Sequence, residues 1–249
     1  MTSRKSSSPV QTIAVARPAS AKRKKAVAEV ASPPGGRSSA RREQQRSIDS
    51  RLAILDAALA EFADKGFDGA SMRDIGERAG LHYTLISYHF GTKETLWKAT
   101  AEHFFSEITE MWETEAPILP GGDPIDRIRD AFHALMHFLV AKPNFHHFMV
   151  RESRENSPRF TWLMETFLTP VMRRMIPQIE EAQEHGDLPT ANPVMIYYFM
   201  IGITSTLSSL GAEIRYNSGL NPTDPEVVER YWKLVDQIVF RRKLFDRER

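Results

Sequence analysis

Four histidines in the middle of the chain have a spacing that could bind a metal. His133 and His137 are four residues apart, which places both on one face of a helix, and His146 and His147 follow after a short break. Three imidazole nitrogens from this set could meet at one zinc or nickel ion. The segment lacks the glutamate of an H-E-x-x-H metalloprotease, because Ala134 follows His133. A metal sensor or a metal-assisted hydrolase is therefore an alternative hypothesis, and no residue is assigned as a metal ligand.

Other catalytic signals are absent from the sequence. The chain has no cysteine, which excludes disulfides, thiol catalysis and cysteine-bound metal, and fits a reducing cytoplasm. We find no P-loop, no dinucleotide-binding glycine fingerprint and no G-x-S-x-G elbow. The sequence thus predicts a protein that is not an enzyme and that needs no cofactor.

The segment from 47 to 97 has the start and stop signals of several short helices. Gly66 is expected to end the first helix in a left-handed conformation, with Phe67 folding back onto its last turn. Ser71 is expected to cap the second helix, with Asp74 reaching back to the free amides. Steps of three and four predict one buried stripe on the first helix, made of Leu52, Leu55, Leu59 and Phe62.

A tight turn at Gly80 precedes a third predicted helix, from about His82 to Phe90. Its expected outer face carries Thr84 and Tyr88. A helix of this width can enter the major groove of DNA, where hydroxyl and amide groups read base edges.

A fourth helix is expected to open at Lys93, capped by Thr92. Free amide hydrogens and a lysine charge at a helix N-terminus can bind one phosphate. The order of these signals predicts a helix-turn-helix unit that reads DNA.

Three motifs in this segment, ASMRDIG, AGLHYTLISYHF and TKETLW, resemble the TetR family of bacterial transcriptional regulators. The close match covers about a fifth of the chain. The resemblance implies an all-helical homodimer, in which a three-helix DNA-binding head precedes a larger, variable domain that binds a small effector and dimerises.

The resemblance also implies roles for individual residues of the head. The second helix would reach a base or a phosphate, the start of the third helix would read bases, and later positions would contact the DNA backbone. Two residues depart from the common pattern: His82 stands where many members have a small hydroxyl cap, and Ser87 where many have a phosphate-binding tyrosine. The DNA-binding candidates are Arg73, His82, Tyr83, Thr84, Leu85, Ser87, Tyr88, His89 and Lys93.

Charge is distributed unevenly along the chain. Residues 1–46 hold 11 Lys and Arg against two acids, whereas the remainder holds 22 against 30, and the net charge is only +1. Without an apolar period this tail is expected to be disordered, and it either follows DNA phosphates or merely aids solubility. Its only apolar run, 10–16, is too short and too polar for a secretory signal.

The chain beyond residue 93 is predicted to be an effector-binding and dimerisation domain, 93–249, after the head at 47–92. Helices are expected at 93–114, 126–141, 144–156, 158–185, 193–212 and 225–245, and no segment alternates like a strand. Large side chains on these helices suggest an apolar pocket, although such residues also fill any bundle core. The pocket candidates are Phe104, Ile108, Met111, Trp112, Phe132, Met136, Phe148, Met149, Arg151, Trp162 and Phe167.

The last two predicted helices are rich in apolar residues. The uncharged stretch 193–212 contains too many hydroxyl residues to favour a membrane span, so we expect these helices to form a four-helix interface in a homodimer. Such a dimer would read a palindromic operator and leave it when an apolar effector binds. A ligand-independent architectural DNA-binding protein is the remaining alternative.

Overall fold

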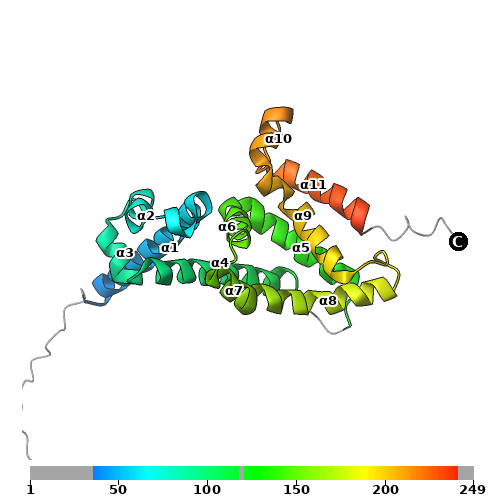
Figure 1. Cartoon of the computed structure of the whole chain (residues 1–249), viewed down its shortest axis with the longest axis horizontal. Coiled ribbons are helices and arrows are strands. Elements are labelled where there is room, and N and C mark those ends of the chain that lie inside the picture. The colour runs from blue at the N-terminus through cyan, green and yellow to red at the C-terminus, as the bar shows by residue number, and fades with distance from the viewer. Residues whose placement is uncertain (1–35, 118–120, 241–249) are drawn as a thin grey trace, which may run out of the picture. The chain divides into compact units, whose positions relative to one another are not determined.

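The computed structural model describes residues 36–117 and 121–240, with side chains from Arg41 onward. Among the described residues, those up to Arg42 belong to a different compact unit from Glu43 and the residues after it. Most of the described residues lie in helices (Figure 1). No described residue lies in a strand, as the sequence predicts. The predicted tail up to residue 35 lies outside this description.

The first three helices form the head: α1 (Gly36–Gly69), α2 (Met72–Ala79) and α3 (Tyr83–Phe90). Helix α1 starts at Gly36, so 36–46 are helical and the predicted boundary of a disordered tail at 46 is wrong for these residues. Gly66 has φ 72° and ψ 176°, which interrupts α1 where the sequence predicts its end. The core of the head is made of fully buried Ile54, Ala58, Phe62, Ile75 and Ile86.

The predicted stripe on α1 needs one correction. Leu55, Leu59 and Phe62 are buried, but Leu52 is 42% exposed. Ile54 and Ala58 are fully buried, because the buried face of α1 includes the row of residues 54, 58 and 62.

Helix α4 (Lys93–Glu115) leads from the head into the larger domain (Figure 1). There α5 packs against α8 and α9, α8 packs against α9, and α6 contacts α9. The remaining elements are α5 (Pro124–Ala141), α6 (Pro143–Ser153), α7 (Pro158–Leu163), the π-helical turn η1 (Met164–Leu168), α8 (Thr169–Glu184), α9 (Pro193–Ser209), α10 (Gly211–Ser218) and α11 (Pro225–Val239).

Prolines define where the helices of this domain begin. Five of them open with proline, a residue that already has a helical φ and lacks the N–H that a first turn leaves unpaired. Ser157, Asn192 and Asp224 add side-chain caps just before such prolines.

Several helices differ from their predicted extent: α6 ends at Ser153 and not at 156, and α11 ends at Val239 and not at 245. The predicted helix 158–185 contains the π-helical turn η1, where extra residues are fitted between α7 and α8. The predicted helix 193–212 ends at Ser209, and α10 follows with an axis bent by 61° from that of α9. No single described helix has the length and hydropathy to cross a membrane; α9 and α10 reach them only as this bent pair.

Candidate nucleic-acid interface

Helix α3 presents its predicted DNA-reading residues on the surface of the head. Tyr83 is 50% exposed and Tyr88 82% exposed, and His82, Thr84 and Ser87 are also exposed. Leu85 and His89 are half-buried. The opposite side of the helix is anchored by buried Ile86 and Phe90. The sequence therefore predicted correctly which face of α3 is free.

His82 caps α3 in place of the hydroxyl residue that is common at this position. Its Nδ1 lies 2.9 Å from Thr84 Oγ1 and accepts a longer contact of 3.4 Å from the Thr84 amide. The two rings of His82 and Tyr83 lie 4.9 Å apart. The start of α3 is thus fixed by side chains that are themselves DNA-binding candidates.

The turn between α2 and α3 depends on two glycines. Gly80 adopts a left-handed conformation, φ 67°, and closes α2 as predicted. Gly76, within α2, lies so close to the turn that a Cβ atom there would be 2.8 Å from the carbonyl oxygen of Leu81. A side chain at Gly76 would therefore push α3 away from α2, a constraint that sequence periodicity did not reveal.

Ion pairs fasten α2 to the end of α1. Ser71 accepts the Asp74 amide as predicted, but the Asp74 carboxylate does not reach back to the free amides. It binds Lys65 instead, at 2.8 Å, and this contact lowers the pKa of Asp74 and raises the pKa of Lys65 to about 12. Buried Glu61 forms ion pairs with Lys65 at 2.6 Å and with Arg78 at 3.2 Å. The capping-box prediction is right for the serine and wrong for the acid.

Lys93 has a different environment from the one that the sequence predicts. Its Nζ donates to the carbonyl oxygens of Phe67 at 2.7 Å, Ala70 at 2.9 Å and Asp68 at 3.4 Å, and lies over the Phe67 ring. An ammonium group has three donors, and these three carbonyls can take all of them. Lys93 thus bonds to the end of α1 and to Ala70, whereas the sequence predicts a contact with the DNA backbone.

Arg73 is exposed and pairs with Glu77 one turn later, at 3.1 Å. An exposed pair of this kind stabilises a helix by only about 0.3–0.5 kcal/mol. The guanidinium can therefore exchange the carboxylate for a base or a phosphate at little cost.

A buried polar contact joins the first turn of α4 to the larger domain. Trp97 Nε1 donates to Glu152 Oε1 of α6 at 3.1 Å, and both side chains are almost fully buried. Arg159 of α7 lies beside this pair, with its guanidinium 3.8 Å from the centre of the Phe67 ring. Burial raises the pKa of Glu152, an effect that the Trp97 hydrogen bond and Arg159 only partly oppose.

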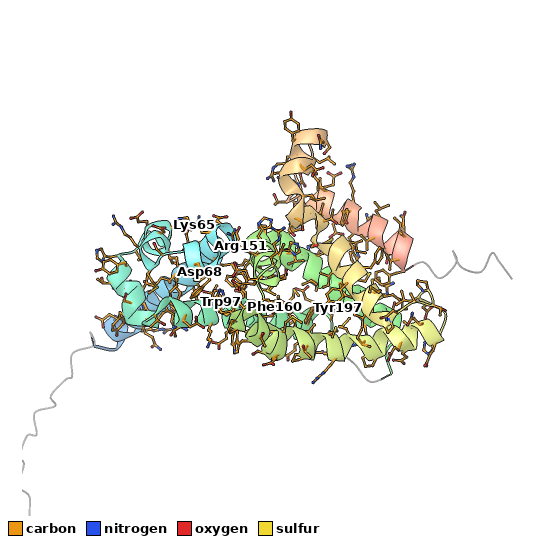
Figure 2. The ribbon with its side chains drawn as sticks, in the orientation of Figure 1. Lys65, Asp68, Trp97, Arg151, Phe160 and Tyr197 are labelled. Atoms are coloured by element: carbon orange, nitrogen blue, oxygen red, sulfur yellow. The ribbon has the colours of Figure 1, made fainter. Side chains whose placement is uncertain are left out.

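Arg151, labelled in Figure 2, reaches from α6 to the end of α1. Its Nη1 donates to the carbonyl oxygen of Asp64 at 2.8 Å, and its Nε would lie 2.7 Å from a Cβ atom on Gly66. The prediction that Arg151 orients an effector is not supported, because its guanidinium binds the end of α1. Neighbouring Glu152 points to a different partner, Trp97.

Most of the predicted pocket residues are core. Phe104, Phe132, Met136 and Phe148 are almost fully buried. Phe105 and Phe167 stack at 4.3 Å, which closes the space between α4 and η1. Ile108 is also buried, and Met111, Trp112, Met149, Trp162 and Phe167 pack around the core while partly buried.

Two small cavities remain among these residues. One of about 20 Å³ is bordered by Trp112, Ala131 and Met175, and one of about 10 Å³ by Phe132, Met175 and Tyr197. Burial raises the pKa of Tyr197 to about 12, so its phenol stays protonated. Of the predicted pocket residues, Trp112 borders both cavities and Phe132 the smaller one, and their role in binding an effector stays a prediction.

A larger cleft, of about 470 Å³, opens where α6 faces Ala63 of α1 and Ser209 of α9. It is lined by His146, His147, Arg151 and Arg154, together with Val150 and Glu155. Among the predicted pocket residues only Arg151 borders it.

Helices α9 and α11 carry large apolar side chains that the rest of the described chain leaves exposed. Met195, Tyr198 and Phe199 lie on α9, and Leu234 and Ile238 on α11. The two helices are joined by a hydrogen bond of 2.7 Å from the Tyr231 hydroxyl to the Ile203 carbonyl. These five exposed residues are called the apolar patch below.

The predicted histidine cluster is only partly assembled. His133 and His137 do meet on α5, with 3.0 Å between their Nε2 atoms. His146 and His147 lie on α6 and border the large cleft instead. The third member of the cluster is Glu229 of α11, which no spacing rule could connect to α5.

The chain is similar to known regulatory proteins. Residues 54–100 match the model described as bacterial regulatory proteins, tetR family. The HTH-type transcriptional repressor Rv3405c of Mycobacterium tuberculosis is 38% identical over 78 residues, which are 31% of this chain and 39% of the relative. The probable HTH-type transcriptional regulator YttP of Bacillus subtilis is 20% identical over 76% of this chain and 91% of its own length.

Solved structures share the fold over more of the chain. AibR, in a complex with isovaleryl coenzyme A and operator DNA, superposes with a TM-score of 0.61 at 14% identity, over 77% of this chain and 98% of AibR. Rv3405c itself is matched over only about two fifths of its length. The match to the tetR family model, at residues 54–100, covers most of the helix-turn-helix head and the start of α4, and in this head the chain is similar to the TetR family of bacterial regulatory proteins.

Proposed function

We propose that this protein is a transcriptional repressor that binds a palindromic operator as a homodimer and leaves it when a small molecule binds the larger domain. The free face of α3 carries the proposal: Tyr83, Thr84 and Tyr88 are exposed on a helix whose opposite side is anchored in the head. Residues near the N-terminus of such a helix reach base edges in the major groove.

Dimerisation is supported by the apolar patch on α9 and α11. Exposed apolar residues that cluster on two adjacent helices favour contact with another surface. A twofold axis through this patch would bring four helices together and place two identical heads on one DNA molecule. Each head would then read one half of a palindrome.

The small cavities between α4, α5, α8 and α9 are the proposed binding site for an apolar effector. Neither is larger than about one water molecule, so a ligand would have to displace Met175 or Trp112. Methionine adapts its shape easily, which makes such an opening inexpensive. Tyr197 offers one neutral phenol to orient a polar group of the ligand.

Movement of α4 would carry the signal to the head. Trp97 and Lys93 stand in the first turns of α4, and both are bonded to other elements, Trp97 to α6 and Lys93 to the loop after α1. An effector that binds better to one position of α4 shifts the population of head separations. The spacing of the two recognition helices then no longer fits the operator.

The test is selection from genomic DNA fragments with the purified full-length chain at physiological salt. We expect one palindrome to be enriched, and expect the double variant Tyr83→Ala, Thr84→Ala to lose that enrichment. Tyr216→Ala is the matched control, because Tyr216 is an exposed tyrosine on α10, outside the head, and should leave enrichment unchanged. Binding that is indifferent to sequence would overturn the proposal and support an architectural protein.

Two further experiments test whether α3 or the N-terminal tail recognises DNA, and where the protein is located in the cell. If the double variant keeps full enrichment while removal of 1–46 abolishes it, α3 does not read the operator. A protein that binds an operator would act in the cytoplasm together with the DNA, and localisation of a fluorescent fusion would check this.

A further inference from the structure

Three side chains from two helices bring their ligand atoms together near the apolar patch. The Nε2 atoms of His133 and His137 are 3.0 Å apart. Glu229 Oε1 lies 3.3 Å from Nε2 of His137 and 3.9 Å from Nε2 of His133. The histidines belong to α5 and the glutamate to α11, so the cluster joins two elements that are far apart in sequence.

These separations suit a tetrahedral metal ion. With bonds of about 2.0–2.1 Å, two ligands of tetrahedral zinc are about 3.3 Å apart. The three distances between ligand atoms, 3.0, 3.3 and 3.9 Å, lie on both sides of this value. A small rotation of the Glu229 side chain would bring its oxygen nearer to His133. Two imidazoles and a carboxylate are a donor set that zinc, cobalt and nickel accept.

The surroundings fix part of the site and leave part of it open. The His133 ring lies 4.7 Å from the indole of Trp232 and meets the His137 ring edge-on at 4.6 Å. Trp232 is buried, so it holds His133 in place. The side chains of His133, His137 and Glu229 are 38%, 43% and 50% exposed, which leaves room for water as a fourth ligand.

We propose that His133, His137 and Glu229 bind one divalent transition-metal ion, with zinc as the best match. The ion would take the position between the two Nε2 atoms, and the proton of the donor ring would move to Nδ1 of the same ring, the neutral tautomer that binds metal through Nε2. It would fasten α11 to α5 and thereby fix the position of Leu234 and Ile238 within the apolar patch. The metal-binding proposal does not depend on the proposed function. Only the effect of the metal on dimerisation rests on the proposed function.

The test uses the untagged full-length chain, stripped with a chelator and titrated with Zn²⁺ by calorimetry. We expect one ion per chain, and expect His137→Ala and Glu229→Gln each to weaken binding by at least about tenfold, which is 1.4 kcal/mol. Matched controls are His147→Ala, on α6, and Glu226→Gln, an exposed residue of α11 paired with Arg230. Neither control should change the affinity.

Cobalt provides a second readout that does not depend on variants. Co²⁺ in this site should give the intense visible absorption of a four-coordinate ion, displaced by Zn²⁺ at one equivalent. Binding that survives His137→Ala and Glu229→Gln, or that is lost in His147→Ala instead, would overturn the proposal. Absence of stoichiometric Zn²⁺ binding to the unaltered chain would also overturn it and leave a hydrogen-bonded histidine pair.

Discussion

Trp97 and Glu152 are 55 residues apart in sequence, yet their side chains share a buried hydrogen bond of 3.1 Å. The second carboxylate oxygen of Glu152 and the Nε atom of Arg159 are both buried without a hydrogen-bond partner among the described residues, 3.9 Å from each other. A polar group that is only half satisfied in the interior is costly. A small shift of α4 relative to α6 and α7 would therefore change the energy of this contact, which suits a junction between head and larger domain.

Replacing Trp97 with phenylalanine should destabilise the protein by about 1–3 kcal/mol, because Glu152 would lose its buried donor. Urea unfolding followed by circular dichroism measures this change. Trp162→Phe is the control: it lies 5.8 Å from Trp97, removes the same ring atoms, and its indole makes no hydrogen bond among the described residues. Equal losses in the two variants would show that packing, and not the hydrogen bond, holds the junction.

The raised pKa of Glu152 predicts how Glu152→Gln depends on pH. Because the folded-state pKa lies above its ordinary value of 4.5, the protonated form favours folding, and this stability is lost as pH rises through the folded pKa. Glutamine stays neutral and can still accept from Trp97. Relative to the unaltered protein, the variant should therefore gain stability between pH 4.5 and pH 7.5. Urea midpoints at these two values test the sign, and a difference that does not change with pH would contradict it.

Lys93→Met should lower stability without changing the salt dependence of DNA binding. The loop carbonyls of Phe67, Asp68 and Ala70 would lose their donor, at a cost of about 1–3 kcal/mol. A lysine that neutralises a phosphate instead contributes about 0.9 to the slope of log K against log salt concentration. Binding measured at several salt concentrations separates the two roles, and a reduced slope would restore the phosphate assignment. Lys98→Met, one turn along α4, should affect stability little.

Phe199→Glu should separate the proposed dimer into monomers. A charge placed within the apolar patch would have to be buried on association, which should weaken dimerisation by at least about 2 kcal/mol, or roughly thirtyfold. Light scattering after size exclusion measures the mass, and operator affinity should fall together with it. Tyr216→Glu adds the same charge at a more exposed position of α10 and should leave the mass unchanged. A dimer that persists with Phe199→Glu would place the interface elsewhere.

The local features of the head could be predicted from the sequence because each depends on residues a few positions apart. Ser71 caps α2, Gly80 takes a left-handed conformation, and the free face of α3 follows from its helical period. Gly66 has the expected positive φ, but its ψ of 176° is not that of a left-handed helix cap. The start of α1 was predicted too late, since the polar stretch before residue 47 has no apolar period although it is helical from Gly36. The effector pocket was predicted too broadly, because the same large side chains serve as a wall or as a filled core.

Residue types, spacings and caps by themselves determined the all-helical class, the helix-turn-helix unit and the exposed face of its third helix. Only the tertiary structure decided which long side chains meet across the fold. Lys93 binds a loop 26 residues earlier, Arg151 binds a carbonyl 87 residues earlier, and Glu229 joins two histidines of another helix. The physical reason is that a helical period fixes the direction of a side chain on its own helix, whereas its partner depends on how the helices pack.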